Sequence, residues 1–195
     1  GAANCIISKS SLNFPKNKII KVDNTFSFLN RLASLKRYYS NGAIIAVTGS
    51  SGKTSVKDLL GNLLQNYGKT YFSQKSFNNS YGVPLSLCNL EEEHKYGVFE
   101  IGMSKSGEID QLSQLVKPNI AIITNIAEAH IENFKSLKDI AKAKAEIINN
   151  ISTKGSLIID RDSKFYNFFK FEAKKRGIKV ISVGFNSNSN IQIVK

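Results

Sequence analysis

Apolar runs alternate with helical patterns along residues 43–184 of this chain. The runs predict strands that are buried on both faces, because such strands are apolar at every position. The segments between them repeat apolar residues every three to four positions, as helices do. The predicted strands lie at 43–48, 69–74, 96–101, 119–124, 156–160 and 178–184, and the predicted helices at 53–67, 106–116, 136–151 and 163–176. The repeated units predict an α/β fold with a mostly parallel sheet and helices on both faces.

The two ends of the chain do not continue this pattern. Residues from Thr25 to Tyr38 predict one more helix, which leads directly into the first strand. The polar stretch 186–190 predicts a loop, and Ile191 to Lys195 predict the beginning of a strand. Neither terminus has the pattern expected at the edge of a complete domain.

The first predicted strand stops at a short glycine loop, within the sequence Ala-Ile-Ile-Ala-Val-Thr-Gly-Ser-Ser-Gly-Lys-Thr at 43–54. Gly49 and Gly52 permit a tight turn whose N–H groups can face a phosphate, and the next helix adds its positive end. Lys53 would reach the outer phosphates of ATP and the Thr54 hydroxyl would bind Mg²⁺. The loop is G-x-x-G-K-T, shorter than the usual G-x-x-x-x-G-K-[ST]. An ordinary turn with a chance Gly-Lys-Thr is the alternative, and the strand and amphipathic helix around it favour a P-loop-type mononucleotide-binding domain.

Polar residues follow two other predicted strands at their carboxyl ends, where parallel sheets bind ligands. Glu100 is placed to hold Mg²⁺ beside a phosphate loop, and the alternative is an edge carboxylate that faces water. Asn125 and His130 follow the next strand, and His130 is either a ligand or a structural histidine. The other histidine, His94, lies in a charged run and is expected to be solvated.

Lys144 lies at the centre of an apolar stripe on the predicted helix 136–151, whereas Lys142 lies on its solvent face. The stripe consists of Leu137, Ile140, Ala141, Ile147, Ile148 and Ile151. An inward lysine is costly unless it is paired, neutralised or modified. Its ammonium can escape to water at the end of a buried stem. Alternatively, a lowered pKa lets the amine react with CO₂ to give a carbamate, which could bind a second Mg²⁺.

The net charge of +12 has two interpretations. It can serve a polyanionic ligand, or it can reflect a Lys-, Asn- and Ile-rich composition with lysines on solvated faces. The lysines are scattered, which favours the second. No apolar stretch approaches the ~20 residues that cross a bilayer, and the first residues lack the basic and apolar regions expected of a signal peptide. Cys5 and Cys88 form no C-x-x-C pattern, so we expect a cytoplasmic protein without disulfide or zinc.

Several ordered motifs resemble those of the Mur ligases. They are Val47-Thr-Gly-Ser-Ser-Gly-Lys-Thr, Ser76-Phe-Asn-Asn-Ser-Tyr-Gly-Val-Pro-Leu, Phe99-Glu-Ile-Gly, Gly107-Glu-Ile, Thr124-Asn-Ile-Ala-Glu-Ala-His and Ala141-Lys-Ala-Lys-Ala-Glu-Ile. The second and last motifs are most similar to the members that join D-alanyl-D-alanine to UDP-N-acetylmuramoyl-tripeptide in peptidoglycan synthesis. The resemblance covers nearly the whole chain.

The resemblance implies roles for the matching residues. Catalysis would involve Lys53, Glu100, His130 and Lys144. ATP would be bound by Gly49, Ser50, Ser51, Gly52, Lys53, Thr54, Ser55 and Asn125. Two Mg²⁺ ions would be held by Thr54, Glu100, His130 and a carbamylated Lys144, and the muramoyl-peptide would lie near Asn78 and Asn79. The substrate carboxylate would attack the γ-phosphate of ATP, and the amine of D-alanyl-D-alanine would attack the resulting acyl phosphate.

This chain departs from the family pattern in two motifs and in its extent. Ser55 replaces a common Thr. Asp160-Arg161-Asp162 replaces an Asn-x-Asp, so the resemblance does not decide whether this segment contacts adenine. Residues 1–40 resemble the end of the N-terminal, UDP-binding domain, and 41–195 resemble the central ATP-binding domain, cut short at its C-terminal end. The C-terminal ligase domain is absent, so we expect a monomeric fragment that is inactive alone.

Two other functions fit parts of the pattern. The first is another ligase with the same core, such as a different Mur ligase or a folylpolyglutamate synthetase, although the segment 76–84 argues against it. The second is a non-catalytic module that binds nucleotide or nucleic acid, for which the net charge is the only argument. We expect no nucleic-acid partner and no membrane insertion.

Overall fold

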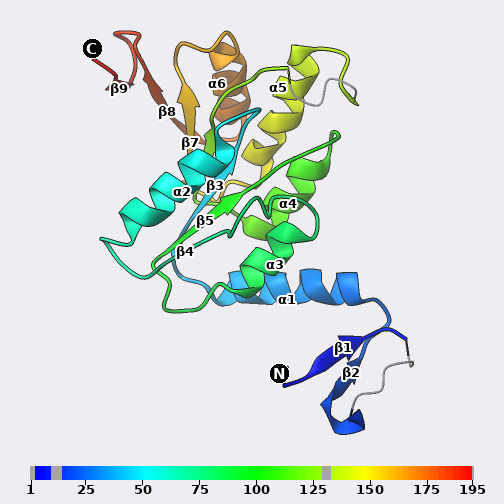
Figure 1. Ribbon diagram of the computed structural model, residues 1–195. Coiled ribbons are helices and arrows are strands. Elements are labelled where there is room, and N and C mark those ends of the chain that lie inside the picture. Colours follow the sequence, from blue (N-terminus) through cyan, green and yellow to red (C-terminus); the bar gives the residue numbers. More distant parts are fainter. Residues whose placement is uncertain (1–2, 10–14, 129–132, 195) are drawn as a thin grey trace.

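The computed structural model describes residues 3–9, 15–128 and 133–194. Its main sheet has seven strands, and every neighbouring pair is parallel (Figure 1). Their order is β4 (Thr70–Phe72), β5 (Tyr96–Glu100), β3 (Ala43–Thr48), β6 (Ile120–Ile123), β7 (Ser156–Asp160), β8 (Lys179–Gly184) and β9 (Ile191–Gln192). The predicted parallel α/β fold is therefore confirmed. After β3 the chain forms the edge strand β4, returns to β5 beside β3, and then crosses to β6 on the other side of β3. Such a change of direction in the strand order places a crevice suited to a ligand at the carboxyl ends of the central strands.

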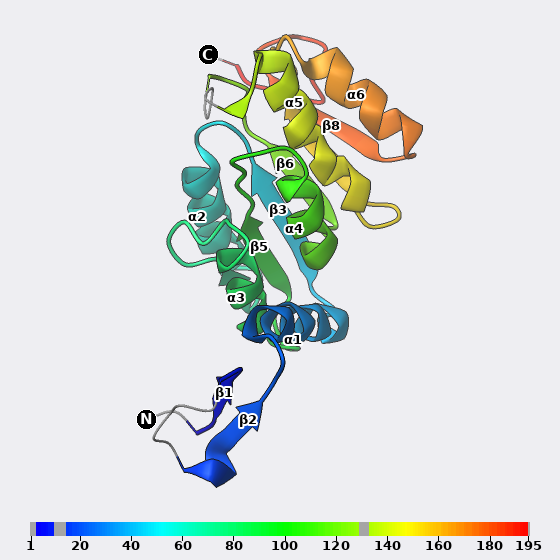
Figure 2. The ribbon, with the colours of Figure 1, turned by 90° about the vertical axis from the view of Figure 1, so that its right-hand side faces the viewer.

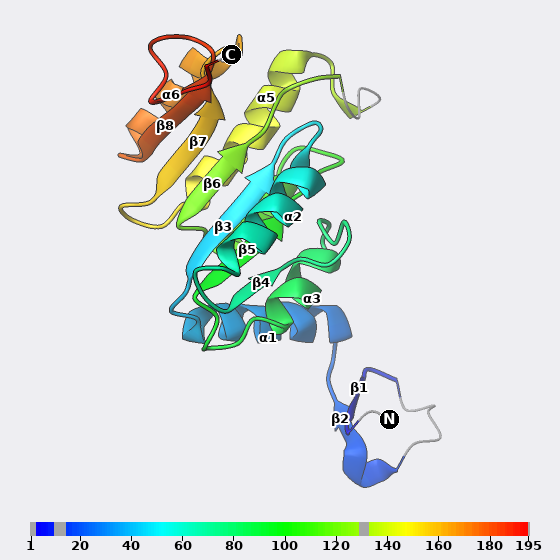
Figure 3. The ribbon, with the colours of Figure 1, turned by 60° about the vertical axis from the view of Figure 1, so that its left-hand side comes forward.

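Helices cover both faces of the sheet, because alternate residues of a strand point to opposite sides. Ile45 and Val47 of β3 pack with α2 (Lys53–Leu64), which lies in front of the sheet in Figure 3. Ile44 and Ala46 belong to the larger core on the other face. That face carries α3 (Gly82–Cys88), α4 (Glu108–Val116), α5 (Leu137–Ala145) and α6 (Tyr166–Lys175), and Figure 2 shows the last three in front of the strands.

The helix α1 (Thr25–Tyr39) packs against this body, at the lower edge of the sheet in Figure 1. Ala33 is fully buried in the larger core. The Arg37 guanidinium donates from Nε to Val116 O over 2.7 Å and from Nη2 to Lys117 O over 2.8 Å, just where α4 ends. Burial lowers the pKa of Arg37. These contacts fix α1 to α4.

Two short strands lie before α1 and extend away from the main body (Figure 1). They are β1 (Cys5–Ile7) and β2 (Ile19–Lys21), with the 3-10 turn η1 (Lys16–Lys18) just before β2. They pair in parallel as a separate sheet. Within the described residues, no helix is long and apolar enough to cross a membrane.

The structure corrects three details of the sequence prediction. The predicted helix 136–151 is α5 followed by the 3-10 turn η3 (Glu146–Asn150). The helix α3 was not predicted, although Asn79 Oδ1 accepts from the N–H of Gly82 over 2.9 Å where it begins. The solvated position expected for His94 is wrong, because its side chain is buried and Nδ1 accepts from the N–H of Glu91 over 2.9 Å.

Candidate active site

The phosphate loop joins β3 to α2 and has the conformation that its glycines predict. Gly49 has φ +152° and Gly52 has φ +75°, where other residues are strained. A Cβ on Gly49 would also overlap the Thr124 hydroxyl. Lys53 and Thr54 follow as the first residues of α2. Their N–H groups are among those that a helix leaves without internal partners, so this end can receive an anion.

The loop is bonded to the segment that follows β6. Asn125 Oδ1 accepts from the N–H of Ser51 over 2.9 Å, and its Nδ2 donates to Ser51 Oγ over 2.7 Å. The N–H of Ser50 donates to Asn125 O over 3.0 Å. Thr124 Oγ1 donates to Ser51 O over 2.6 Å. The predicted neighbours Asn125 and the phosphate loop are therefore in contact, and the loop is held before any ligand arrives.

Glu100 lies at the carboxyl end of β5, next to the start of α2. Its side chain is 1% exposed. Oε2 accepts from Thr54 Oγ1 over 2.7 Å, and Oε1 accepts from Asn78 Nδ2 over 2.7 Å. Ser76 Oγ is 3.5 Å from Thr54 Oγ1. The structure thus brings a buried carboxylate and two hydroxyls together beside the phosphate loop, which is a set of oxygen donors of the kind that Mg²⁺ prefers.

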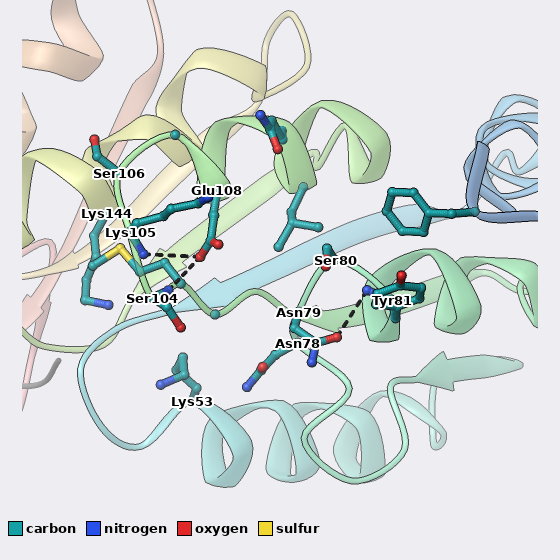
Figure 4. Close-up of a pocket in the computed structure, with 16 residues that line it drawn as sticks. Lys53, Asn78, Asn79, Ser80, Tyr81, Ser104, Lys105, Ser106, Glu108 and Lys144 are labelled. Atoms are coloured by element: carbon teal, nitrogen blue, oxygen red, sulfur yellow. Dashed lines mark hydrogen bonds between the residues drawn. The ribbon is translucent and has the colours of Figure 1, made fainter. Parts of the chain in front are cut away.

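Lys144 points from α5 toward the phosphate loop (Figure 4). Its side chain is only 2% exposed. Burial first, and then the positive charge of Lys53, lower the pKa of Lys144 to about 7. Lys53 Nζ itself donates to Gly49 O over 3.0 Å. The inward position predicted for Lys144 is confirmed, and a large share of its amine is neutral near pH 7.

A pocket of about 610 Å³ opens beside these lysines (Figure 4). It is lined by Phe26, Lys53, Asn78, Asn79, Ser80, Tyr81, Gly102, Met103, Ser104, Lys105, Ser106, Gly107, Glu108, Gln111, Leu112 and Lys144. Both predicted substrate residues, Asn78 and Asn79, lie in this wall. Phe26 and Tyr81 are in contact at its far end, with ring centroids 4.7 Å apart. The pocket therefore has the amines of Lys53 and Lys144 at one end and an aromatic pair at the other.

For two predicted site residues the structure gives no contact with the groups described above. His130 lies outside the described residues, so its predicted role stays a prediction. Ser55 is exposed on the first turn of α2. Within the described residues, no group of three or more His, Cys, Asp or Glu side chains could hold a metal ion. A cation at Thr54 and Glu100 would take its other ligands from phosphate and water, as Mg²⁺ commonly does.

The sequence profile of the Mur ligase middle domain matches residues 47–195. The chain belongs to the Mur ligase family. A protein of Rickettsia prowazekii (strain Madrid E), named UDP-N-acetylmuramoyl-tripeptide–D-alanyl-D-alanine ligase, is 40% identical over 195 residues, or 100% of this chain and 43% of that protein. Crystal structure II of MurF from Acinetobacter baumannii matches 97% of this chain and 40% of that chain, with a TM-score of 0.84 and 31% identity.

MurF from Thermotoga maritima, solved in complex with ADP, also matches this Mur ligase chain. The TM-score is 0.80 at 29% identity, over 96% of this chain and 42% of that chain. The chain spans less than half the length of these relatives. The resemblance to the Mur ligases is confirmed, and these relatives carry the name of the D-alanyl-D-alanine-adding members.

Glu146 is a residue of the Mur ligase site that sequence reasoning missed. Its Oε1 accepts from Ser106 Oγ over 2.9 Å and from the N–H of Gly107 over 2.8 Å, and Oε2 accepts from the N–H of Asp110 over 3.2 Å. A carboxylate here caps the positive end of α4. The motifs that contain Lys144 and Gly107 are therefore in direct contact through Glu146.

The Asp160-Arg161-Asp162 segment has a structural use in this Mur ligase chain. Asp162 Oδ2 accepts from the N–H of Phe185 over 2.6 Å, and Oδ1 accepts from the N–H of Asn186 over 3.1 Å. Asp160 Oδ1 accepts from the N–H of Asp162 over 2.8 Å. Asp162 thus holds the turn after β8.

Proposed function

We propose that this chain is the ATP- and Mg²⁺-binding part of a ligase that joins D-alanyl-D-alanine to UDP-N-acetylmuramoyl-tripeptide. The observation that carries the proposal is the bond between Thr54 and Glu100 at the mouth of a preformed phosphate loop. The names of the 40% identical relative and of the matching MurF structures support the choice of substrates. The same names argue against another ligase with the same core.

In this proposal each site residue acts through its charge and position. Backbone N–H groups at the start of α2 and the Lys53 ammonium hold the phosphates of ATP, with Asn125 keeping the loop in place through the N–H groups of Ser50 and Ser51. Thr54 and Glu100 hold Mg²⁺, and a bound Mg²⁺ neutralises phosphate charge and so lowers the repulsion between two anions. His130 and Lys144 serve a second ion.

The proposed chemistry has two displacements. The carboxylate oxygen of the tripeptide attacks the γ-phosphorus of ATP, and ADP leaves with the electron pair of the broken bond. The amine of D-alanyl-D-alanine then attacks the acyl carbon, phosphate leaves, and the nitrogen releases a proton. The Lys53 ammonium at one end of the pocket suits the carboxylate, and Asn78 and Asn79 lie along the wall for the rest of the peptide.

We also propose that Lys144 reacts with CO₂. Its amine attacks the carbon of CO₂ and loses a proton, which gives an anionic carbamate able to bind a cation. The support is its burial and a pKa of about 7, because only the neutral amine is a nucleophile. Carbon-13 NMR with labelled bicarbonate would give a carbamate signal that is absent from Lys144→Met and present in Lys142→Met.

The domain assignment is part of the proposal. We propose that the central domain begins at α1 and not at residue 41 as the sequence predicted, that it lacks its C-terminal end, and that the UDP-binding and C-terminal ligase domains complete the whole protein. The packing of α1 on α4 supports a boundary between β2 and α1 rather than at residue 40. A cytoplasmic monomer without a nucleic-acid partner fits this function, and steeply salt-dependent binding to DNA or RNA would contradict it.

Calorimetry of ATP binding tests the nucleotide site. With Mg²⁺ present, we expect the chain to bind ATP and the variant Lys53→Ala to lose at least about tenfold in affinity. The matched control is Lys175→Ala on α6, whose ammonium pairs with Glu172 over 2.9 Å. A folded chain that binds no ATP would overturn the proposal for this chain. Amide formation by the whole protein, compared among amine substrates, tests D-alanyl-D-alanine.

A further inference from the structure

Lys57 is among the largest fully buried side chains of the described residues, and the site described above does not use it. It lies one turn after Lys53 on α2 and is 1% exposed. Its Nζ is 2.7 Å from Ser73 O, 3.0 Å from Lys75 O and 2.8 Å from Asp58 Oδ1. An ammonium has three N–H donors, so every donor of Lys57 has an acceptor.

The two carbonyls belong to the turn that follows β4. Lys75 in this turn has φ +50°, a left-handed conformation that is strained for a residue with a Cβ. Such a conformation persists only where the surrounding structure fixes it. The Lys57 ammonium binds the carbonyls on both sides of Gln74, so it fixes this strained turn against α2.

The same turn leads directly to the residues that face Glu100. Ser76 Oγ lies 3.5 Å from Thr54 Oγ1, and Asn78 Nδ2 donates to Glu100 over 2.7 Å. The backbone of Asn78 is also fixed, because its carbonyl oxygen accepts from the N–H of Gly102 over 2.8 Å. The chain from residue 73 to residue 78 therefore connects the Lys57 ammonium to the candidate metal site.

We infer that Lys57 is a positioning residue for the Thr54–Glu100 pair. It holds the turn 73–75 on α2, so that Ser76 and Asn78 reach that pair and set its geometry for a cation. A methionine would fill the same space without the cost of burying a charge, so the benefit of the ammonium lies in the acceptors that it holds, and two of the three are carbonyls of this turn. The inference deepens the proposed function and rests on it where Mg²⁺ is concerned.

Hydrogen exchange in the ligand-free chain tests the positioning itself. In Lys57→Met we expect the amides of Asn78 and Gly102 to exchange about tenfold faster, because the turn loses charge-assisted bonds. Lys175→Met, a lysine with an intrahelical carboxylate partner on α6, is the matched control. Unchanged exchange at both amides in Lys57→Met would overturn the inference, whatever the chain binds. If this variant does not fold, Lys57→Gln takes its place with the same expectations.

ATP titrations with and without Mg²⁺ test the link to the site. We expect Lys57→Met to bind ATP without Mg²⁺ as tightly as the wild type, since the phosphate loop is intact. The factor by which Mg²⁺ raises the ATP affinity should be about ten times smaller in this variant than in the wild type. The double variant Lys57→Met with Asn78→Ala should have the same Mg²⁺-dependent ATP affinity as Asn78→Ala alone, because Lys57 acts on the metal site through Asn78. Equal losses with and without Mg²⁺, or additive losses in the double variant, would indicate a merely structural lysine. A wild-type chain that shows no Mg²⁺-dependent binding would refute the proposed function, and hydrogen exchange would still decide the positioning.

Discussion

The Thr54 hydroxyl donates to Glu100 Oε2 over 2.7 Å, although the two residues are 46 positions apart in the chain. The other carboxylate oxygen accepts from Asn78 over 2.7 Å. Hydroxyl and amide groups are neutral, so the bonds to Thr54 and Asn78 orient the carboxylate without cancelling its charge. This is the arrangement expected of a residue that keeps its negative charge for a cation.

Replacing Glu100 by Gln removes the charge and keeps the shape. The factor by which Mg²⁺ raises the ATP affinity should be at least about ten times smaller in Glu100→Gln than in the wild type, because a neutral amide attracts the cation less. Without Mg²⁺ the affinity should stay the same or rise, since a negative charge near the phosphates is gone. Calorimetry at two Mg²⁺ concentrations measures both, with Glu172→Gln on α6 as the control. An unchanged Mg²⁺ gain would rule out Glu100 as the metal ligand.

Lys144 should make the stability of the chain depend on pH. The unfolded chain keeps this lysine protonated up to its ordinary pKa of 10.5, whereas the folded chain releases the proton near a pKa of about 7. Between these values the unfolded state binds more protons, so the free energy of unfolding rises with pH through this window. Below about pH 7, Lys144 is protonated in both states, so the burial of its charge lowers the free energy of unfolding by an amount that does not change with pH.

We therefore expect Lys144→Met to be more stable than the wild type at about pH 6, by on the order of 2 kcal/mol. The difference should shrink as the pH rises toward 10. Urea unfolding in CO₂-free buffers measures it. Lys142→Met is the matched control, because that side chain is 57% exposed on the same helix, and its free energy should follow the wild type at every pH. A constant difference for Lys144→Met would contradict the burial of the charge.

Gly49 can be tested against a glycine that has room around it. Gly49→Ala places a Cβ on the Thr124 hydroxyl and should lower the free energy of unfolding by about 3 kcal/mol or more. Gly177 has φ +67° and nothing within 4 Å of a new Cβ, so Gly177→Ala should cost only about 1 kcal/mol of conformational strain. Urea unfolding of both variants separates overlap from strain, and equal losses would mean that the loop and Thr124 are not packed together.

Arg37 tests whether α1 belongs to the body of the sheet. Arg37→Met leaves the carbonyls of Val116 and Lys117 without their donor, so we expect a loss of about 2 kcal/mol in the free energy of unfolding. Arg31→Met, at an exposed position of the same helix, should have little effect. If the two variants are equally stable, α1 does not contribute to the stability of the sheet.

The fold could be predicted where each segment carries its own signal. The strands 43–48 and 156–160 were predicted with the bounds that β3 and β7 have, because each is an apolar run that ends at a turn or a charge. The helix α3 was missed because Pro84 lies inside it. Pro84 is in the first turn, where the missing N–H has no partner to lose, and Asn79 supplies a cap that could have revealed the helix.

Those site residues that a local sequence signal marks could be predicted, and the others could not. Lys53, Thr54, Glu100 and Asn125 each lie at or after the carboxyl end of a strand, so their common edge was implied by the order of elements. The buried positions of Lys57 and His94 were not, because nothing local distinguishes them from solvated residues of the same type. The contact of Glu146 with Gly107 spans 39 positions and depends on how η3 packs beside α4.

The bond from Lys53 Nζ to Gly49 O has a consequence for the heat of binding. In the free chain the lysine already has an acceptor, supplied by the loop that it serves. A phosphate that captures the ammonium exchanges this carbonyl oxygen for an anionic one, so for this bond only the difference between the two acceptors enters the enthalpy. The contribution of this bond to nucleotide affinity therefore depends on the charge of the phosphate rather than on the gain of a hydrogen bond.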